Sequence, residues 1–152
     1  YLALNAQVNA ANIGYHGMRN YKNINCVIIN EKEIRHELRD KNSKIELLMK
    51  KLAKQQKIKN LIVTQGTSGS LLYNLRINKF NKCEAFAKNT VDKIGAGDAM
   101  LSLISICLSN NIDKDLSMLI SSLAAAHSVE TIGNKSMVTK TQTLKTLENT
   151  LK

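Results

Sequence analysis

The residues best suited to chemistry form a short glycine-rich segment that ends in a carboxylate. Residues 91–98 read Val-Asp-Lys-Ile-Gly-Ala-Gly-Asp and run directly into an apolar stretch. A helix that begins at this loop presents unpaired backbone N–H groups and the positive end of its dipole, which together attract an anion. Asp98 beside such an anion can accept the proton of an attacking hydroxyl group. The structural alternative is that Gly95 and Gly97 form a tight turn and Asp98 begins the helix.

A second candidate is the pair Asn30 and Glu33, which directly follows an apolar run. An amide and a carboxylate three residues apart can share one side of a helix start. Such a pair can orient a phosphate or the water shell of Mg²⁺, which keeps most of its waters and takes few protein ligands. Taken alone, the pair is more typical of a capped helix start.

The third candidate is the loop over residues 64–69, which reads Thr-Gln-Gly-Thr-Ser-Gly. Its two glycines, Gly66 and Gly69, let the backbone approach a bound group closely, and the neighbouring side chains offer hydroxyl groups. A tight turn between two strands explains the same residues. The loop is not a Walker A loop, because the Gly-Lys-Ser/Thr ending is missing.

The order of these three segments resembles the ribokinase-like carbohydrate kinases of the phosphofructokinase B type. The shared pattern is Asn-x-x-Glu, then Thr-x-Gly-x-x-Gly, then Asp-x-x-Gly-Ala-Gly-Asp, and the last motif is the most specific. The resemblance runs from about residue 30 to residue 133, with weaker similarity upstream through residues 4–9. The upstream part is similar to the heptose-phosphate kinase branch, which is involved in making ADP-heptose.

The resemblance implies that Asp98 is the catalytic base, which takes the proton of a sugar hydroxyl as its oxygen attacks the γ-phosphate of ATP. A carboxylate at a helix N-terminus stays ionised near neutral pH, as a base must. The backbone amides of Gly95, Ala96 and Gly97 would form the anion hole.

The resemblance also implies a nucleotide site and a metal site. Its nucleotide-binding residues are Asn30, Glu33, Thr64, Gly66, Gly69, Ala125 and Gly133. Glu33 is associated with Mg²⁺, and Asp92 with a monovalent cation such as K⁺. Lys93 and Ile94 depart from the family's usual Thr-Thr or Thr-x, so potassium activation is left open. For His127, beside the segment that flanks adenine, a core position is at least as good an interpretation as a specific contact.

The whole chain restricts the setting of this chemistry. Its 152 residues are 43% hydrophobic and carry a net charge of +10, which fits one globular domain over 1–152. No apolar run approaches the roughly 20 residues of a membrane-spanning helix, and the start lacks the features of a signal peptide. Three widely spaced cysteines at 26, 83 and 107 argue against a structural zinc site and predict a reducing cytoplasm. The lysines at 50–59 are interpreted as a solvated helix face.

The elements expected to position these loops alternate in type. Apolar runs predict strands over residues 1–5, 26–29, 60–64, 70–74 and 83–87. Periodic patterns predict helices from residue 31, over 43–56 and 99–108, from near 113, and over 141–151. Ser43 is the expected N-cap of the second helix, with Glu46 completing a capping box.

Two of the predicted helices carry strong burial expectations. The helix over 99–108 is apolar nearly all round, so it should be central and buried. The next helix should bury one stripe, made up of Leu116, Leu119, Ile120, Leu123 and His127.

Strands that alternate with helices predict an α/β fold with a largely parallel sheet and a site at the carboxyl ends of the strands. The resemblance implies a ribokinase-like three-layer α/β/α architecture, of which this chain is the carboxyl-terminal, nucleotide-binding and catalytic part. On this resemblance, the amino-terminal half and the β lid of the family are expected to lie outside these 152 residues. An exposed sheet edge should therefore drive homo-oligomerisation or association with the missing half.

Three functions remain open at this point. The first is an ATP-dependent phosphotransferase acting on a sugar or sugar phosphate with Mg²⁺. The second is a truncated or split kinase half that binds nucleotide without activity of its own. The third is a basic nucleic-acid-binding domain, for which only the net charge argues; aromatic residues make up just 4% of the chain, too few for a stacking platform.

Overall fold

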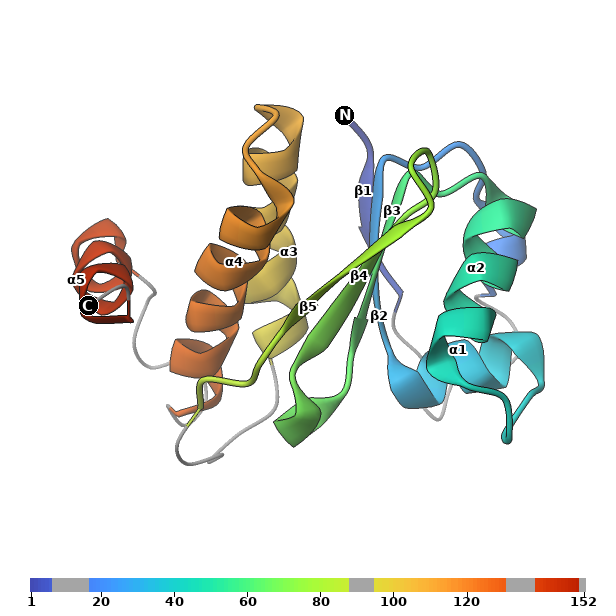
Figure 1. The fold of residues 1–152 in the computed structure, drawn as a ribbon, viewed down its shortest axis with the longest axis horizontal. Helices are drawn as coiled ribbons and strands as arrows, with labels where there is room; N and C mark the ends of the chain where they lie inside the picture. The colour runs from blue at the N-terminus through green and yellow to red at the C-terminus, as the bar shows by residue number, and fades with distance from the viewer. Residues whose placement is uncertain (7–16, 88–94, 131–138, 151–152) are drawn as a thin grey trace. The chain divides into compact units, whose positions relative to one another are not determined.

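The computed structural model describes residues 1–6, 17–87, 95–130 and 139–150. It contains a sheet, two 3₁₀ turns and five labelled helices (Figure 1). The strands are β1 (Ala3–Asn5), β2 (Cys26–Asn30), β3 (Asn60–Thr64), β4 (Ser70–Asn74) and β5 (Lys79–Cys83). The helices are α1 (Glu31–Leu38), α2 (Ile45–Gln56), α3 (Ala96–Ser109), α4 (Lys114–Val129) and α5 (Lys140–Thr150), and the 3₁₀ turns are η1 (Met18–Asn20) and η2 (Gly66–Ser68).

The strands form one sheet in the order β1-β2-β3-β4-β5. β1 pairs with β2 in parallel, β2 pairs with β3 in parallel, and β3 pairs with β4 in antiparallel. The expected largely parallel sheet is therefore confirmed, with an antiparallel turn at β4. In the parallel part, the carboxyl ends of neighbouring strands lie at the same edge of the sheet.

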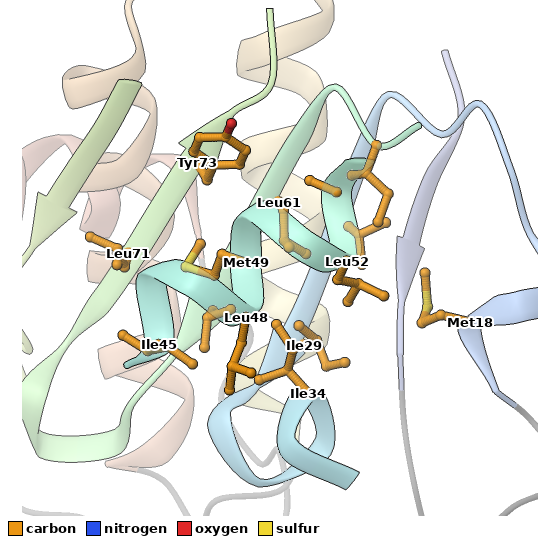
Figure 2. Packing of buried hydrophobic residues seen from close by; sticks show 14 of the residues in the cluster. Met18, Ile29, Ile34, Ile45, Leu48, Met49, Leu52, Leu61, Leu71 and Tyr73 are labelled. Atoms are coloured by element: carbon orange, nitrogen blue, oxygen red, sulfur yellow. The ribbon is translucent and has the colours of Figure 1, made fainter. Parts of the chain in front are cut away.

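The chain divides into two compact units. The first comprises Tyr1–Gln65 and Ser70–Asn81, and the second comprises Gly66–Gly69 and Lys82–Lys152. In the first unit, α1 and α2 pack on the strands and bury an apolar core (Figure 2). The strands contribute residues such as Ile29 and Leu61, and α2 contributes Leu48, Met49 and Leu52. This core holds β2 and β3 side by side and so positions the loops that follow them.

In the second unit, α3 and α4 pack against each other, and α5 contacts α4. Only Met100, Ile104 and Cys107 of α3 are buried, while Ile106 is 58% exposed. The expectation that this helix is buried all round is therefore wrong. A helix in a small unit has few neighbours to cover it, so part of its apolar surface stays exposed.

The stripe expected on α4 is also wrong in part. Leu116 is 38% exposed, whereas Leu123 is buried together with small residues such as Ser117 and Ser121. Small side chains let neighbouring backbones approach closely, so the face that packs is the small one rather than the most apolar one.

Two local predictions need correction as well. Ser43 is not the N-cap of α2, because the helix begins after Lys44 and has no side-chain cap. The Ser43 hydroxyl instead donates to Asp40 Oδ2 at 2.8 Å. A hydrogen bond to a charged carboxylate is stronger than one between neutral groups, so it forms in place of the helix cap. The last strand lies at Lys79–Cys83 rather than over residues 83–87, since it follows β4 after a short turn.

A search of the described residues for a helix long and apolar enough to cross a bilayer found none.

Candidate active site

Two of the expected site residues lie side by side at the carboxyl edge of the sheet. Asn30 ends β2, Thr64 ends β3, and the two residues are direct partners in the parallel ladder. The apolar residues before them are paired in the same ladder, Ile28 with Ile62 and Ile29 with Val63, and all four are buried. The structure thus brings the first residues of two candidate loops together within the first unit.

Asn30 and Glu33 form a reciprocal capping box at the start of α1. Glu33 N–H donates to Asn30 Oδ1, and Asn30 N–H donates to Glu33 Oε2, both at 2.8 Å. The pair therefore forms the capped helix start that its spacing also predicts. Glu33 is 9% exposed, and the hydrogen bond from Asn30 N–H holds its carboxylate at the sheet edge.

The donor set suits a cation that is held mainly by water and phosphate. Within the described ranges, no cluster of three or more His, Cys, Asp or Glu side chains could enclose a metal ion. Mg²⁺ is commonly bound by one or two carboxylates together with substrate phosphates. The single carboxylate of Glu33 fits that mode and does not fit a metal cage built from protein alone.

A second carboxylate at this edge was not singled out from the sequence as a site residue. Glu31 Oε1 accepts from Arg35 Nη2 at 2.7 Å and from Arg35 Nε at 3.0 Å, and Glu31 Oε2 accepts from Gln65 Nε2 at 2.9 Å. The hydrogen bonds from Gln65 and then from Arg35 lower the pKa of the Glu31 carboxyl group. The spacing of Glu31 and Arg35 was a visible signal for the ion pair, whereas the contact with Gln65 depends on the fold.

The loop after β3 is shaped by its two glycines. Gly66 has φ 59° and Gly69 has φ 86°, and Gly69 N–H donates to the Gly66 carbonyl oxygen at 3.1 Å. A Cβ atom on Gly69 would lie 2.1 Å from the backbone oxygen of Cys83, whereas one on Gly66 would meet nothing within 4 Å. Gly69 is therefore required by close packing of backbone, while Gly66 serves the turn and leaves open space beside it.

The start of α3 has the geometry expected of an anion-binding helix end. Gly95 is the N-cap with φ 86° and ψ −13°, and no side chain caps the helix. Asp98 lies exposed in the first turn, and Ala99 N–H is the donor to the Gly95 carbonyl oxygen at 2.9 Å. The preceding amides belong to the first turn, where N–H groups lack partners within the helix. The four residues Gly95, Ala96, Gly97 and Asp98 are thus brought together on one helix end.

An apolar groove of about 440 Å³ lies between α3, α4 and α5. Its walls include Ala99 and Leu103 of α3, Ala124 of α4 and Leu144 of α5, with Lys140 as the charged residue. Ala124 lines the groove, while Ala125 is half-buried and is not among its lining residues. No pattern in the sequence predicts the groove, because its walls come from three separate helices.

Asp92 and Gly133, together with Lys93 and Ile94, lie outside the described residues. Their expected roles in cation and nucleotide binding stay predictions.

Comparison with known proteins identifies the family. The family model described as pfkB family carbohydrate kinase matches residues 16–141, and the chain belongs to this family. A curated relative, the bifunctional protein HldE of Campylobacter concisus, is 31% identical over 118 residues. The aligned part covers 75% of this chain and 24% of that protein, in keeping with the resemblance to the heptose branch.

Solved structures show the same fold. Ribokinase from Thermotoga maritima matches with a TM-score of 0.79 and 22% identity, over 97% of this chain and 56% of that one. Arabidopsis thaliana ribokinase, solved with ribose and ATP, matches with a TM-score of 0.79 and 21% identity, over 96% and 47%. Escherichia coli phosphofructokinase-2, solved with potassium, matches with a TM-score of 0.77 and 15% identity, over 99% and 47%. The expected ribokinase-like α/β fold is confirmed, and the chain spans about half the length of these structures.

Proposed function

We propose that this chain is the nucleotide-binding and catalytic part of a carbohydrate kinase, which moves the γ-phosphate of Mg·ATP to a hydroxyl group of a sugar or sugar phosphate. The observation that carries the proposal is the start of α3, where Gly95 caps the helix without a side chain and Asp98 lies exposed in the first turn. Membership of the pfkB family supports this assignment.

In the proposed reaction, Asp98 accepts the proton of the acceptor hydroxyl group while that oxygen bonds to the γ-phosphorus. The bond from the γ-phosphorus to the bridging oxygen breaks, and ADP leaves with its electron pair. The amides of Gly95, Ala96 and Gly97 stabilise the charge on the transferring phosphoryl oxygens. A bound Mg²⁺ supplies further neutralisation of phosphate charge, with Glu33 as the residue that would help to hold it.

The nucleotide is proposed to contact the residues that the family resemblance assigns to it. Thr64, Gly66 and Gly69 would lie along its phosphates and sugar, where a glycine backbone permits close approach. Ala125 and Gly133 keep their expected role beside the base, and Asp92 its role toward K⁺.

The test is calorimetric titration of the chain with Mg·ATP, followed by turnover with a panel of sugars and sugar phosphates. Asp98→Asn should lower turnover about 10²–10⁴-fold, because proton transfer is lost, while ATP affinity stays within about twofold. Asp115→Asn is the matched control, since Asp115 lies exposed in the first turn of α4. A large loss of ATP affinity in Asp98→Asn would instead assign Asp98 a structural or metal-binding role.

A second candidate function is a kinase half that binds nucleotide and needs association for activity. Two observations favour it: the chain spans about half of the solved relatives, and β1 stands at the end of the sheet order with Leu2 beside it 53% exposed. Among the described strands, only β2 pairs with β1, and a strand edge without a partner promotes pairing with another chain, whether a second copy or the family's amino-terminal half. Light scattering at micromolar concentration without ATP should show association, and a clean monomer would count against it.

A further inference from the structure

Glu31 connects the first turn of α1 with the residue that follows β3. One of its carboxylate oxygens accepts two hydrogen bonds from Arg35, and the other accepts from Gln65 Nε2 at 2.9 Å. Glu31 is the first residue of α1, and Gln65 directly follows Thr64. The contact therefore joins two segments that are 34 residues apart in sequence.

Arg35 is itself held in place, so it can hold Glu31. Its Nη1 donates to the carbonyl oxygens of Ser43 at 2.9 Å and Lys41 at 3.1 Å. The guanidinium group is planar and carries several donors. Nε and Nη2 donate to the Glu31 carboxylate, and Nη1 donates to the connection between α1 and α2. This arrangement restricts the Glu31 side chain to a conformation in which its second oxygen meets Gln65.

Gln65 occupies the point where strand geometry ends and the loop begins. Thr64 before it is held by the ladder with Asn30, and Gly66 after it has a positive φ of 59°. A glycine backbone is conformationally free, so the direction in which the loop leaves the sheet depends on what holds the residue before it. The side chain of Gln65 is held by its hydrogen bond to Glu31.

We propose that Glu31 is a positioning residue for the nucleotide loop: by accepting from Gln65 it sets the direction of residues 65–69 and preorganises them for the nucleotide phosphates. The inference rests on the proposed function, since it assigns a role within the same site. Glu31 does not contact the nucleotide in this proposal and acts through Gln65. Arg35 acts one step further away, by holding Glu31.

The test removes the hydrogen bond and then restores it with the roles of the two residues exchanged. Gln65→Glu places two carboxylates opposite each other and should weaken Mg·ATP binding about tenfold in calorimetric titration. In the double variant Glu31→Gln with Gln65→Glu, the amide at position 31 donates to the carboxylate at position 65, and affinity should return to within about threefold of the original chain. The matched control is Gln55→Glu on the exposed side of α2, which should bind as the original chain does.

Each outcome decides the matter. Loss in the single variant with recovery in the double variant supports the positioning role, and the recovery excludes simple repulsion between phosphate and a carboxylate at position 65. Equal affinity in Gln65→Glu, or no recovery in the double variant, overturns the inference while leaving the proposed function intact. A lower midpoint of thermal unfolding with unchanged affinity would assign the contact to stability alone and overturns it too. If the original chain fails to bind Mg·ATP, the proposed function itself is wrong and the inference falls with it.

Discussion

The two units of the chain bury different kinds of residue. The first unit, with the sheet and α1 and α2, has a core of large branched side chains such as Ile29, Leu48 and Leu61. The second unit buries Ser117 and Ser121 in α4 and leaves Leu116 and Ile106 exposed. The units also differ in charge, with 14 Lys and Arg against 5 Asp and Glu in the first, and 8 against 7 in the second. Hydrophobic periodicity therefore predicts the packed face in the first unit and predicts it only in part in the second.

The buried serines of α4 explain how this second kind of packing is possible. Ser117 Oγ donates to the Asp113 carbonyl oxygen at 2.6 Å, and Ser121 Oγ donates to the Ser117 carbonyl oxygen at 2.8 Å. Each hydroxyl group is satisfied within its own helix, so it enters the interior without an unpaired donor. A small polar residue that is bonded in this way packs like an alanine.

The largest expected effect comes from truncating a buried leucine of the first unit, compared with an exposed leucine of the second. Leu48→Ala should lower the free energy of unfolding by about 2–5 kcal/mol, because the side chain is 1% exposed and its removal leaves a cavity. Leu116→Ala, at a position 38% exposed, should cost less than about 1 kcal/mol. Urea denaturation measures both. Similar losses in the two variants would mean that the exposed leucine of α4 is covered in solution.

An intermediate effect is expected from enlarging a buried serine. Ser121→Leu should lower the free energy of unfolding by about 1–3 kcal/mol, because Ser121 is fully buried and the larger side chain must displace its neighbours. Ser109→Leu, at the exposed end of α3, is the control and should change stability by no more than about 0.5 kcal/mol. A stabilised Ser121→Leu variant would contradict the close packing of small residues.

The effect that is smallest near neutral pH, and develops only in alkaline solution, concerns the thiol of the first unit. Burial raises the pKa of Cys26 from 9.0 to about 12. Below pH 9 the thiol is protonated whether the chain is folded or unfolded. As the pH rises above 9, the unfolded chain loses the proton while the folded chain keeps it, so stability falls between pH 9 and 12. Thermal unfolding across this range should show the decline, and Cys26→Ala should flatten it; an equal slope in both proteins would assign the decline to other groups.

Much of the first unit was predictable because local and global signals agree there. The apolar runs at β2 and β3, each followed by polar residues, predicted the strands and the start of α1 within a residue or two. They also predicted that Asn30 and Thr64 stand at the same edge of the sheet, and the ladder confirms this.

The failures have identifiable physical causes. Two segments fit the capping-box pattern, Asn30 with Glu33 and Ser43 with Glu46, and only the first forms it. Ser43 donates to the Asp40 carboxylate instead of capping α2. Asp40 lies outside the four-residue pattern, so the pattern could not predict this competing hydrogen bond. The groove beside Ala124 and the contact of Glu31 with Gln65 depend on the meeting of distant segments, which periodicity does not encode.

The register between β2 and β3 determines where related chains can accept insertions and deletions during evolution. Because Asn30 is paired with Thr64, an inserted residue in either strand would separate these two side chains and turn the following ones to the opposite face of the sheet. An insertion near the exposed residues 41 and 42, between α1 and α2, changes no pair in the ladder. Insertions and deletions among relatives should therefore collect in that connection, and strand length up to the two loops should stay constant.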